Sequence, residues 1–245
     1  MPADPLAPLL RLADVAPALD EARSRVDAAL RHRALRRQGG RVAAEVSLRA
    51  AVASAALEGH GYATEDVRAG TVTDPVVQGA LRVAEGLGGL IDLWPRAPRQ
   101  VLARLHVLAA RGVVPADDLG RPLAGADRID SLSALVAGNE TTPPLLLAAI
   151  VHAELLTVRP FAGPAGVVAR AAARLTLLSR GFDPRGLVAA EVGHHAREPE
   201  YVGASGAYAT GTPDGLRSWL RHYAAAVAAG ADELTRIGDG VLATA

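Results

Sequence analysis

Residues 151–181 read VHAELLTVRPFAGPAGVVARAAARLTLLSRG, and this stretch decides the fold. Residues 145–158 are apolar on nearly every side, and most of residues 165–180 are apolar as well. A helix that is apolar all round belongs in the centre of a protein, because each of its sides must be covered. The pattern therefore predicts two central helices, joined by a tight turn from Pro160 to Gly166.

This turn is the place where we expect a functional site. A loop that leads straight into a helix leaves backbone N–H groups unpaired at the positive end of the helix dipole. Such a helix start is a natural binding site for an anion or a phosphate group.

Apolar residues at helical spacing predict further helices on both sides of this pair. They cover residues 19–37, 42–57, 74–93, 101–112 and 127–136, and an amphipathic helix begins at residues 212–214. Residues 113–126 are rich in Gly and Pro, which favours a loop or a short β-hairpin, and residues 182–211 read as a looser tail. We expect an all-α bundle of eight or nine helices, with a short β-hairpin flap left open. An N-terminal helical extension, residues 1–41, should pack as one unit with a domain of residues 42–245.

The composition agrees with helices and excludes several functional classes. Only eight of the 245 residues are aromatic, so Ala, Leu and Val must build the core, which suits close-packed helices better than sheets. The chain has no Cys, which excludes disulfides, thiolate metal sites and cysteine nucleophiles. Its 26 basic and 26 acidic side chains cancel, which argues against a generic polyanion binder.

No targeting or membrane segment is expected. The N-terminal stretch lacks the basic region of a signal peptide, and no segment forms an uncharged apolar span of about 18 residues. We therefore expect a cytoplasmic protein that has no membrane partner.

The quoted stretch resembles the signature of the Fic (Fido) family of protein adenylyltransferases. That signature is a buried helix, the motif His-Pro-Phe-x-(Asp/Glu)-Gly-Asn-Gly-Arg-x-x-Arg, and a second buried helix. Pro160, Phe161, Gly166 and Arg170 match the motif in register, and His152 fits the helix that precedes it. Residues 119–122 resemble a shortened form of the family's target-docking flap, and residues 201 and 218–220 resemble its closing helices. The resemblance covers about residues 42–227 and implies a Fic-like helical bundle.

A second motif lies far upstream. Ser54, Glu58 and Gly59 fit the pattern (Ser/Thr)-x-x-x-Glu-(Gly/Asn), an autoinhibitory motif on an N-terminal helix in one class of Fic proteins. The resemblance implies that the inhibitory Glu pairs with the second Arg of the active-site motif, which is Arg170 here. We therefore predict a partly buried ion pair between Glu58 and Arg170. The alternative is a Glu58 side chain that is simply exposed near a helix end.

The chemistry of the family does not carry over. The resemblance implies that the motif His takes the proton from the target hydroxyl, the acid holds Mg²⁺, and the Asn and first Arg bind phosphates. In this chain the four positions hold Arg159, Gly163, Ala165 and Val167. A guanidinium stays protonated and cannot act as a general base, and the motif carboxylate that would hold Mg²⁺ is missing. We expect a pseudoenzyme without a catalytic residue or a cofactor, which would bind ATP and Mg²⁺ only if a residual family activity survived.

The turn still offers positive charge. The candidate ligands for a nucleotide or another anion are Arg159, Gly166, Arg170 and Arg174. Alternatively, Arg159 fills the old pocket itself, either by pairing with Glu58 or by stacking on Phe161. We favour this second arrangement for Arg159.

Other polar residues have two readings each. His152 is either a base displaced by one turn from the lost site or, as we prefer, a core histidine bonded to the backbone. A cluster of metal-ligand residue types also occurs, consisting of Glu191, His194, His195 and Glu198. Its spacing matches no HExxH-type pattern, and adjacent His side chains point apart on a helix, so we expect no metal site.

Three functions stay open. The first is a catalytically silent Fic-like domain that binds an unidentified protein partner and retains at most an anion or nucleotide pocket. The second is a divergent transferase that moves a nucleotidyl group (AMP) onto a protein hydroxyl. The third is a helical regulator that binds nucleic acid through segment 31–41, which has five Arg and no acid. A solvated helix face is the preferred reading of that segment, because no aromatic side chains interleave with its Arg. A homodimer also stays open.

Overall fold

The computed structural model describes residues 4–138 and 141–244. Within these ranges the chain forms twelve α-helices, three short 3-10 helices and no β-strand, which confirms the all-α prediction. The α-helices are α1 (Val15–Ala29), α2 (Ala34–Arg37), α3 (Gly39–Ala56), α4 (Thr64–Arg68), α5 (Pro75–Gly86), α6 (Pro98–Ala110), α7 (Ala126–Gly138), α8 (Pro144–Val158), α9 (Ala165–Ser179), α10 (Ala190–Ala196), α11 (Glu198–Ala209) and α12 (Pro213–Ala243). The 3-10 helices are η1 (Ala7–Arg11), η2 (Leu87–Leu90) and η3 (Ala116–Asp118). Across the described ranges, no helix combines the length and the apolar character needed to span a lipid bilayer.

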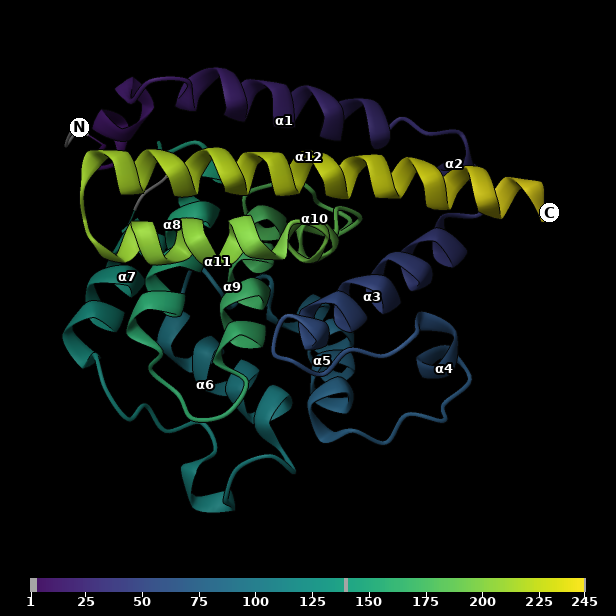
Figure 1. The fold of residues 1–245 in the computed structure, drawn as a ribbon, viewed down its shortest axis with the longest axis horizontal. Coiled ribbons are helices and arrows are strands. Elements are labelled where there is room, and N and C mark those ends of the chain that lie inside the picture. The colour runs from purple at the N-terminus through teal and green to yellow at the C-terminus, as the bar shows by residue number, and fades with distance from the viewer. Residues whose placement is uncertain (1–3, 139–140, 245) are drawn as a thin grey trace.

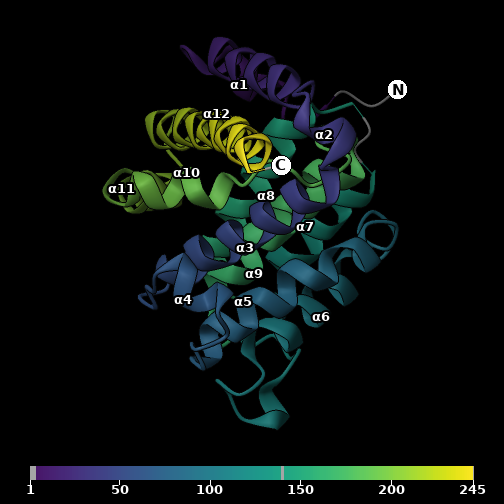
Figure 2. The same ribbon diagram turned by 90° about the vertical axis from the view of Figure 1, so that its right-hand side faces the viewer.

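Helices α8 and α9 form the centre of the protein, as predicted. On α9 every residue from Ala165 to Leu178 is buried, and on α8 every residue from Leu145 to Ala153 is buried. Figures 1 and 2 show α1 and α12 on one side of this pair and α5 and α6 on the other. The two helices without a polar face therefore lie between two outer layers.

Each central helix contributes to two hydrophobic clusters. On α8, Leu146 belongs to the cluster with α1 and α12, whereas the next residue, Leu147, belongs to the cluster with α5 and α6. On α9, Leu177 and Leu175 are divided in the same way. Because opposite sides of each helix face different clusters, both sides must be apolar. This explains the sequence pattern of residues 145–180.

The helix count and some boundaries differ from the prediction. The expected helix over residues 19–37 is two helices, because the chain turns at His32, whose Nδ1 accepts a hydrogen bond from the N–H of Ala34 and whose Nε2 lies 3.2 Å from Asp239 on α12. Gly39 begins α3 instead of ending the preceding helix. A Cβ atom there would lie 2.7 Å from the Arg185 guanidinium, so any side chain at this position would displace the end of Arg185. The expected loose tail contains α10 and α11, which pack on α12.

The segment between α6 and α7 is not a β-hairpin. It holds η3 and one isolated bridge between Arg111 and Val114, so the hairpin option is wrong for this part of the described chain. Its backbone is fixed by two hydrogen bonds, from the N–H of Gly120 to Nδ1 of His106 (2.9 Å) and from the N–H of Leu123 to the carbonyl of Pro160 (2.7 Å). The first bond ties the segment to α6, and the second ties it to the central turn.

Helices α8, α10, α11 and α12 meet around a buried cluster of rings. Its members are His152, His194, Tyr201, Trp219, His222 and Tyr223. His152 Nε2 lies 3.0 Å from the Tyr201 hydroxyl, and His194 Nδ1 lies 3.0 Å from His222 Nε2. Burial lowers the pKa of His152 and of His194 well below the usual range. Burial, reinforced by the charge of Arg197, lowers the pKa of His222 to about 4.

We expect the free energy of unfolding to decrease as the pH falls from about 6.5 towards 4. In this window the unfolded chain protonates these three histidines while the folded chain keeps them neutral. Each histidine adds a slope of up to about 1.4 kcal/mol per pH unit. Urea unfolding at several pH values between neutral and mildly acidic measures this slope.

The matched variants are His222→Gln and His195→Gln. His222→Gln removes one buried group and should give a shallower pH dependence. His195→Gln is the control for the replacement of an exposed histidine, since the His195 side chain is 47% exposed. A stability that stays flat across the window in the unmodified chain would contradict the assignment of neutral buried histidines.

The packing of α5 against α6 gives a second prediction. A Cβ atom on Gly79 would lie 2.0 Å from the carbonyl oxygen of Ala109, whereas one on Gly206 of α11 would meet nothing within 4 Å. We expect Gly79→Ala to lower the free energy of unfolding by about 1–3 kcal/mol through overpacking. The control Gly206→Ala should raise it by about 0.5–1 kcal/mol, because Ala favours a helix. Denaturant unfolding measures the free energy of unfolding of both variants. Equal changes in the two would contradict the close contact between Gly79 and Ala109.

Candidate functional site

The turn between α8 and α9 is held from the side of α6. His106 is fully buried, its ring stacks on Phe161 with centroids 4.7 Å apart, and its Nε2 lies 2.9 Å from the carbonyl oxygen of Ala162. Since Nδ1 accepts the N–H of Gly120, Nε2 must carry the proton and donate to Ala162. Burial lowers the pKa of His106, which favours this neutral form. Sequence reasoning missed His106, because a lone histidine on a helix carries no signal of what it contacts.

Glu58 and Arg170 form the predicted ion pair. Arg170 Nη2 donates to Glu58 Oε1 at 2.8 Å, and the exposed fractions of the two side chains are 2% for Arg170 and 16% for Glu58. Glu58 follows the end of α3, and Gly59 behind it has a φ of 87°, a conformation that favours glycine. The inhibitory-type motif therefore ends α3 so that its carboxylate reaches the first turns of α9.

Arg170 is also bonded to Ser54 and Tyr201. Its Nε donates to the Ser54 hydroxyl (2.9 Å), its Nη2 to the Ser54 carbonyl (2.8 Å), and its Nη1 to the Tyr201 hydroxyl (3.1 Å). Burial alone would lower the pKa of Arg170, but Tyr201 and Glu58 outweigh it, so the pKa lies above its usual value. The sequence placed Tyr201 in a closing helix without indicating this contact.

The Glu58 carboxylate lies directly over the start of α9. A Cβ atom on Gly166 would lie 2.0 Å from Glu58 Oε1 and 2.8 Å from Arg170 Nη1, so a side chain there would displace the ion pair. The helix has no side-chain cap, since its N-cap is Pro164, and its positive end favours a negative group. The place where we expected an anion is thus filled by the protein's own carboxylate.

Arg159 does not fill the old pocket, and that prediction is wrong. The residue ends α8 in the left-handed conformation, at φ 45° and ψ 58°, and its side chain is exposed. Among the residues that the structure describes, Glu58 pairs with Arg170, and the Phe161 ring stacks on His106. Both partners that we foresaw for Arg159 are therefore taken.

Two further candidates lie away from the turn. Arg174 is buried one turn beyond Arg170, donates from Nη2 to the carbonyl of Gly186 (2.5 Å), and faces Glu191 at 3.8 Å. His152 is 1% exposed, so the core reading is correct, although its partner is the Tyr201 hydroxyl and not the backbone. Neither side chain can reach a ligand at the start of α9 without rearrangement.

The metal-type cluster is split. Glu191 and His194 are buried, whereas His195 and Glu198 are about half exposed and lie 3.8 Å apart. Over the residues that the structure describes, no group of three or more His, Asp or Glu side chains is arranged to hold a metal ion.

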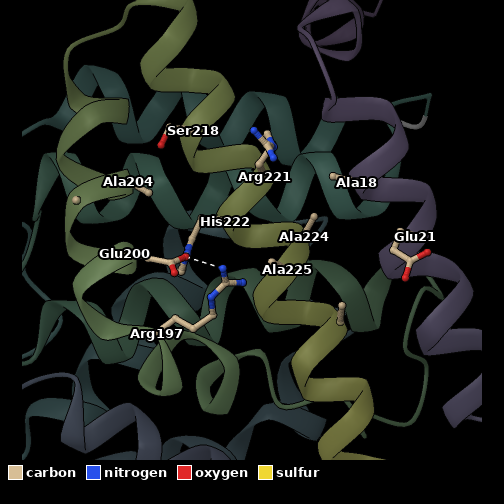
Figure 3. Close-up of a pocket in the computed structure, with 12 residues that line it drawn as sticks. Ala18, Glu21, Arg197, Glu200, Ala204, Ser218, Arg221, His222, Ala224 and Ala225 are labelled. Carbon is tan, nitrogen blue, oxygen red and sulfur yellow. Dashed lines mark ion pairs between the residues drawn. The ribbon is translucent and has the colours of Figure 1, made fainter.

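A separate trough of about 560 Å³ lies between α1, α11 and α12 (Figure 3). None of its lining residues belongs to the turn. In its wall, Arg197 Nη2 lies 2.7 Å from Glu200 Oε2, and His222 lies beside this ion pair. It offers no arrangement of nucleophile and base and is not an active-site candidate.

The side chains of the turn itself offer few groups for acid–base chemistry. Between Arg159 and Val167, the only side chain that is not apolar is the Arg159 guanidinium, which cannot accept a proton. The Glu58 carboxylate reaches the start of α9, and it is engaged with Arg170. The geometry therefore provides a helix start that is covered by Glu58, in a turn without a base of its own.

Comparison with known proteins agrees with this architecture. No family model matches the sequence, and no curated protein is significantly similar to it. A Fic family protein from Desulfovibrio desulfuricans G20 is 23% identical, with a TM-score of 0.69, and the match covers 89% of this chain and 74% of that protein. Fic-1 from C. elegans is 18% identical, with a TM-score of 0.72, over 95% of this chain and 74% of that one. The chain therefore has the helical fold of Fic proteins.

Proposed function

We propose that this Fic-fold chain has lost AMP transfer and acts as a binding or regulatory protein. The observation that carries the proposal is the position of Glu58. Its carboxylate pairs with Arg170 and fills the space over Gly166, where the phosphates of a nucleotide would meet the start of α9. A second negative group at this place would be repelled by the first.

The side chains of the turn support the same conclusion. General-base catalysis contributes about 10²–10⁴-fold to a rate, and the position of the motif base holds Arg159. The position of the motif acid holds Gly163, which has a φ of 71° and whose added Cβ would lie 2.9 Å from Val114. A carboxylate for Mg²⁺ is therefore absent from that position and would not fit there without rearrangement.

A divergent transferase is less well supported. Its base would have to be His152, because Arg159 remains charged. His152 is buried, lies against Tyr201 and is surrounded by rings of α10, α11 and α12. A target hydroxyl could not approach it without opening the core.

The proposal predicts that no protein is labelled by ATP. The unmodified chain and the Glu58→Gly variant are each incubated with α-labelled ATP, Mg²⁺ and a cell lysate, and labelled protein is measured. We expect no label above background from either, because Glu58→Gly opens the site but restores neither base nor metal ligand. Label that disappears in the Glu58→Gly, His152→Gln double variant would assign a catalytic role to His152 and overturn the proposal.

Removal of Glu58 should restore anion binding without chemistry. In Glu58→Gly, Arg170 keeps its bonds to Ser54 and Tyr201 but loses its carboxylate partner, and the start of α9 is uncovered. ATP should therefore raise the thermal unfolding midpoint in a concentration-dependent way. The unmodified chain should not respond. Glu58→Gln is the matched control, since it keeps the volume and removes the charge, and we expect at most a small response. An equal response of the unmodified chain and Glu58→Gly would show that Glu58 does not close the site.

A further inference from the structure

A second groove, of about 460 Å³, runs between α3 and the end of α12. Figure 1 shows that α2, the beginning of α3 and the end of α12 lie together at one end of the molecule. The groove has an aliphatic part, formed by Leu48, Ile237 and Val241. Four arginine side chains line it, namely Arg41, Arg49, Arg68 and Arg236.

The acids of this groove are buried beneath its arginines. Glu45 accepts hydrogen bonds from Arg49 and Arg68, and Glu233 is paired with Arg49 and Arg236. The exposed fractions of the carboxylate side chains are 15% for Glu45 and 3% for Glu233, whereas those of the three arginines range from 37% to 66%. Arg68 also pairs with Glu65, a carboxylate outside the groove lining that is 79% exposed. The lining itself holds four arginines and one carboxylate, Glu45, so its exposed side chains carry an excess of positive charge although the chain is neutral.

The positive surface extends beyond the groove. Arg31, Arg33, Arg36 and Arg37 are exposed, and none of them takes part in an ion pair between described residues. Arg41 joins this segment to the groove, and its contact is a 3.4 Å hydrogen bond to the Thr244 hydroxyl. Unpaired guanidinium groups on a surface are free to bind carboxylates or phosphates.

The trough of Figure 3 has a different balance of charge. Its two acids, Glu21 and Glu200, are as exposed as its two arginines, Arg197 and Arg221. Its surface charges therefore cancel locally, whereas those of the groove between α3 and α12 do not. Of the two, the groove has the arginine-rich rim and the aliphatic floor.

We infer that this groove binds an acidic, amphipathic helical segment of a partner protein. Carboxylates of that segment pair with the arginine rim, and its aliphatic face covers Leu48, Ile237 and Val241. The groove follows residues 41–49 of α3, about 12 Å of helix, which is enough for about two turns of a bound helix. Nucleic acid is the weaker fit, because none of the lining residues is aromatic and bases would have nothing to stack on.

This inference rests on the binding role proposed above and gives it a surface and a partner chemistry. The two remain separable in experiment. A binding assay on the groove contains no ATP, so a negative result would leave the loss of AMP transfer untouched.

The probe is a fluorescein-labelled helical peptide of about 15 residues, with Leu on one face and Glu on its flanks. Fluorescence anisotropy with the full chain measures its affinity at several salt concentrations. A second peptide, in which Lys replaces every Glu, and a labelled single-stranded RNA are tested alongside. We expect the Glu peptide alone to bind well, and its affinity to fall as salt rises.

Charge and shape are tested separately. The double variant Arg37→Glu, Arg41→Glu touches no buried ion pair and should weaken binding at least about tenfold. Its control is Arg96→Glu, an exposed arginine in the loop before α6. Gly240→Trp should also abolish binding, because Gly240 lines the groove and its Cβ would point into open space, so the ring fills the groove without disturbing the core. Gly206→Trp on α11 is the matched control and should bind as the unmodified chain does.

Three results would each overturn the inference. One is failure of the Glu peptide to bind better than the Lys peptide. Another is binding that survives Gly240→Trp, which would place the peptide outside the groove. The third is RNA that binds more tightly than the Glu peptide and depends on Arg37 and Arg41, which would assign the surface to nucleic acid.

Discussion

A guanidinium that is shut off from water needs a partner for its N–H groups, and this requirement fixes the centre of the protein. Arg170 on α9 meets it with Ser54 of α3, Glu58 just beyond α3, and Tyr201 of α11. Removal of one partner from a buried charge typically costs about 3–5 kcal/mol. Helices α3, α9 and α11 are therefore held in one arrangement. The ion pair between Glu58 and Arg170, which helps to join them, also covers the start of α9.

The central part of the fold could be predicted because burial leaves a strong mark on sequence. Helices α8 and α9 are apolar on nearly every side, and a position between two hydrophobic clusters accounts for that pattern. The short helices α2, α4 and α10 left no such mark, because four to seven residues are too few for a clear helical period. Gly39 was misread as a helix end, since its place against the Arg185 guanidinium depends on a contact distant in sequence.

The candidate site, like the fold, could be predicted only in part. The pair of Glu58 and Arg170 could be foreseen from two motifs, because motifs carry information on contacts across the chain. The position of the Arg159 side chain could not be foreseen. It depends on the backbone conformation at the end of α8 and on the stacking of Phe161 on His106. The groove could not be foreseen from the net charge of zero either. A net charge counts the buried carboxylates of Glu45 and Glu233 equally with the exposed arginines.

The motif positions that match and those that differ have different surroundings in the fold. Phe161 stacks on His106, Gly166 makes room for Glu58, and Arg170 binds three residues of other elements. Each of these side chains, or the lack of one at Gly166, is required by a contact inside the protein. At Gly163 the packing instead disfavours an acidic residue. The backbone of Gly163 is in a left-handed conformation, and a side chain there would crowd Val114. The matching residues can therefore be explained by folding and by closure of the turn, without any demand from catalysis.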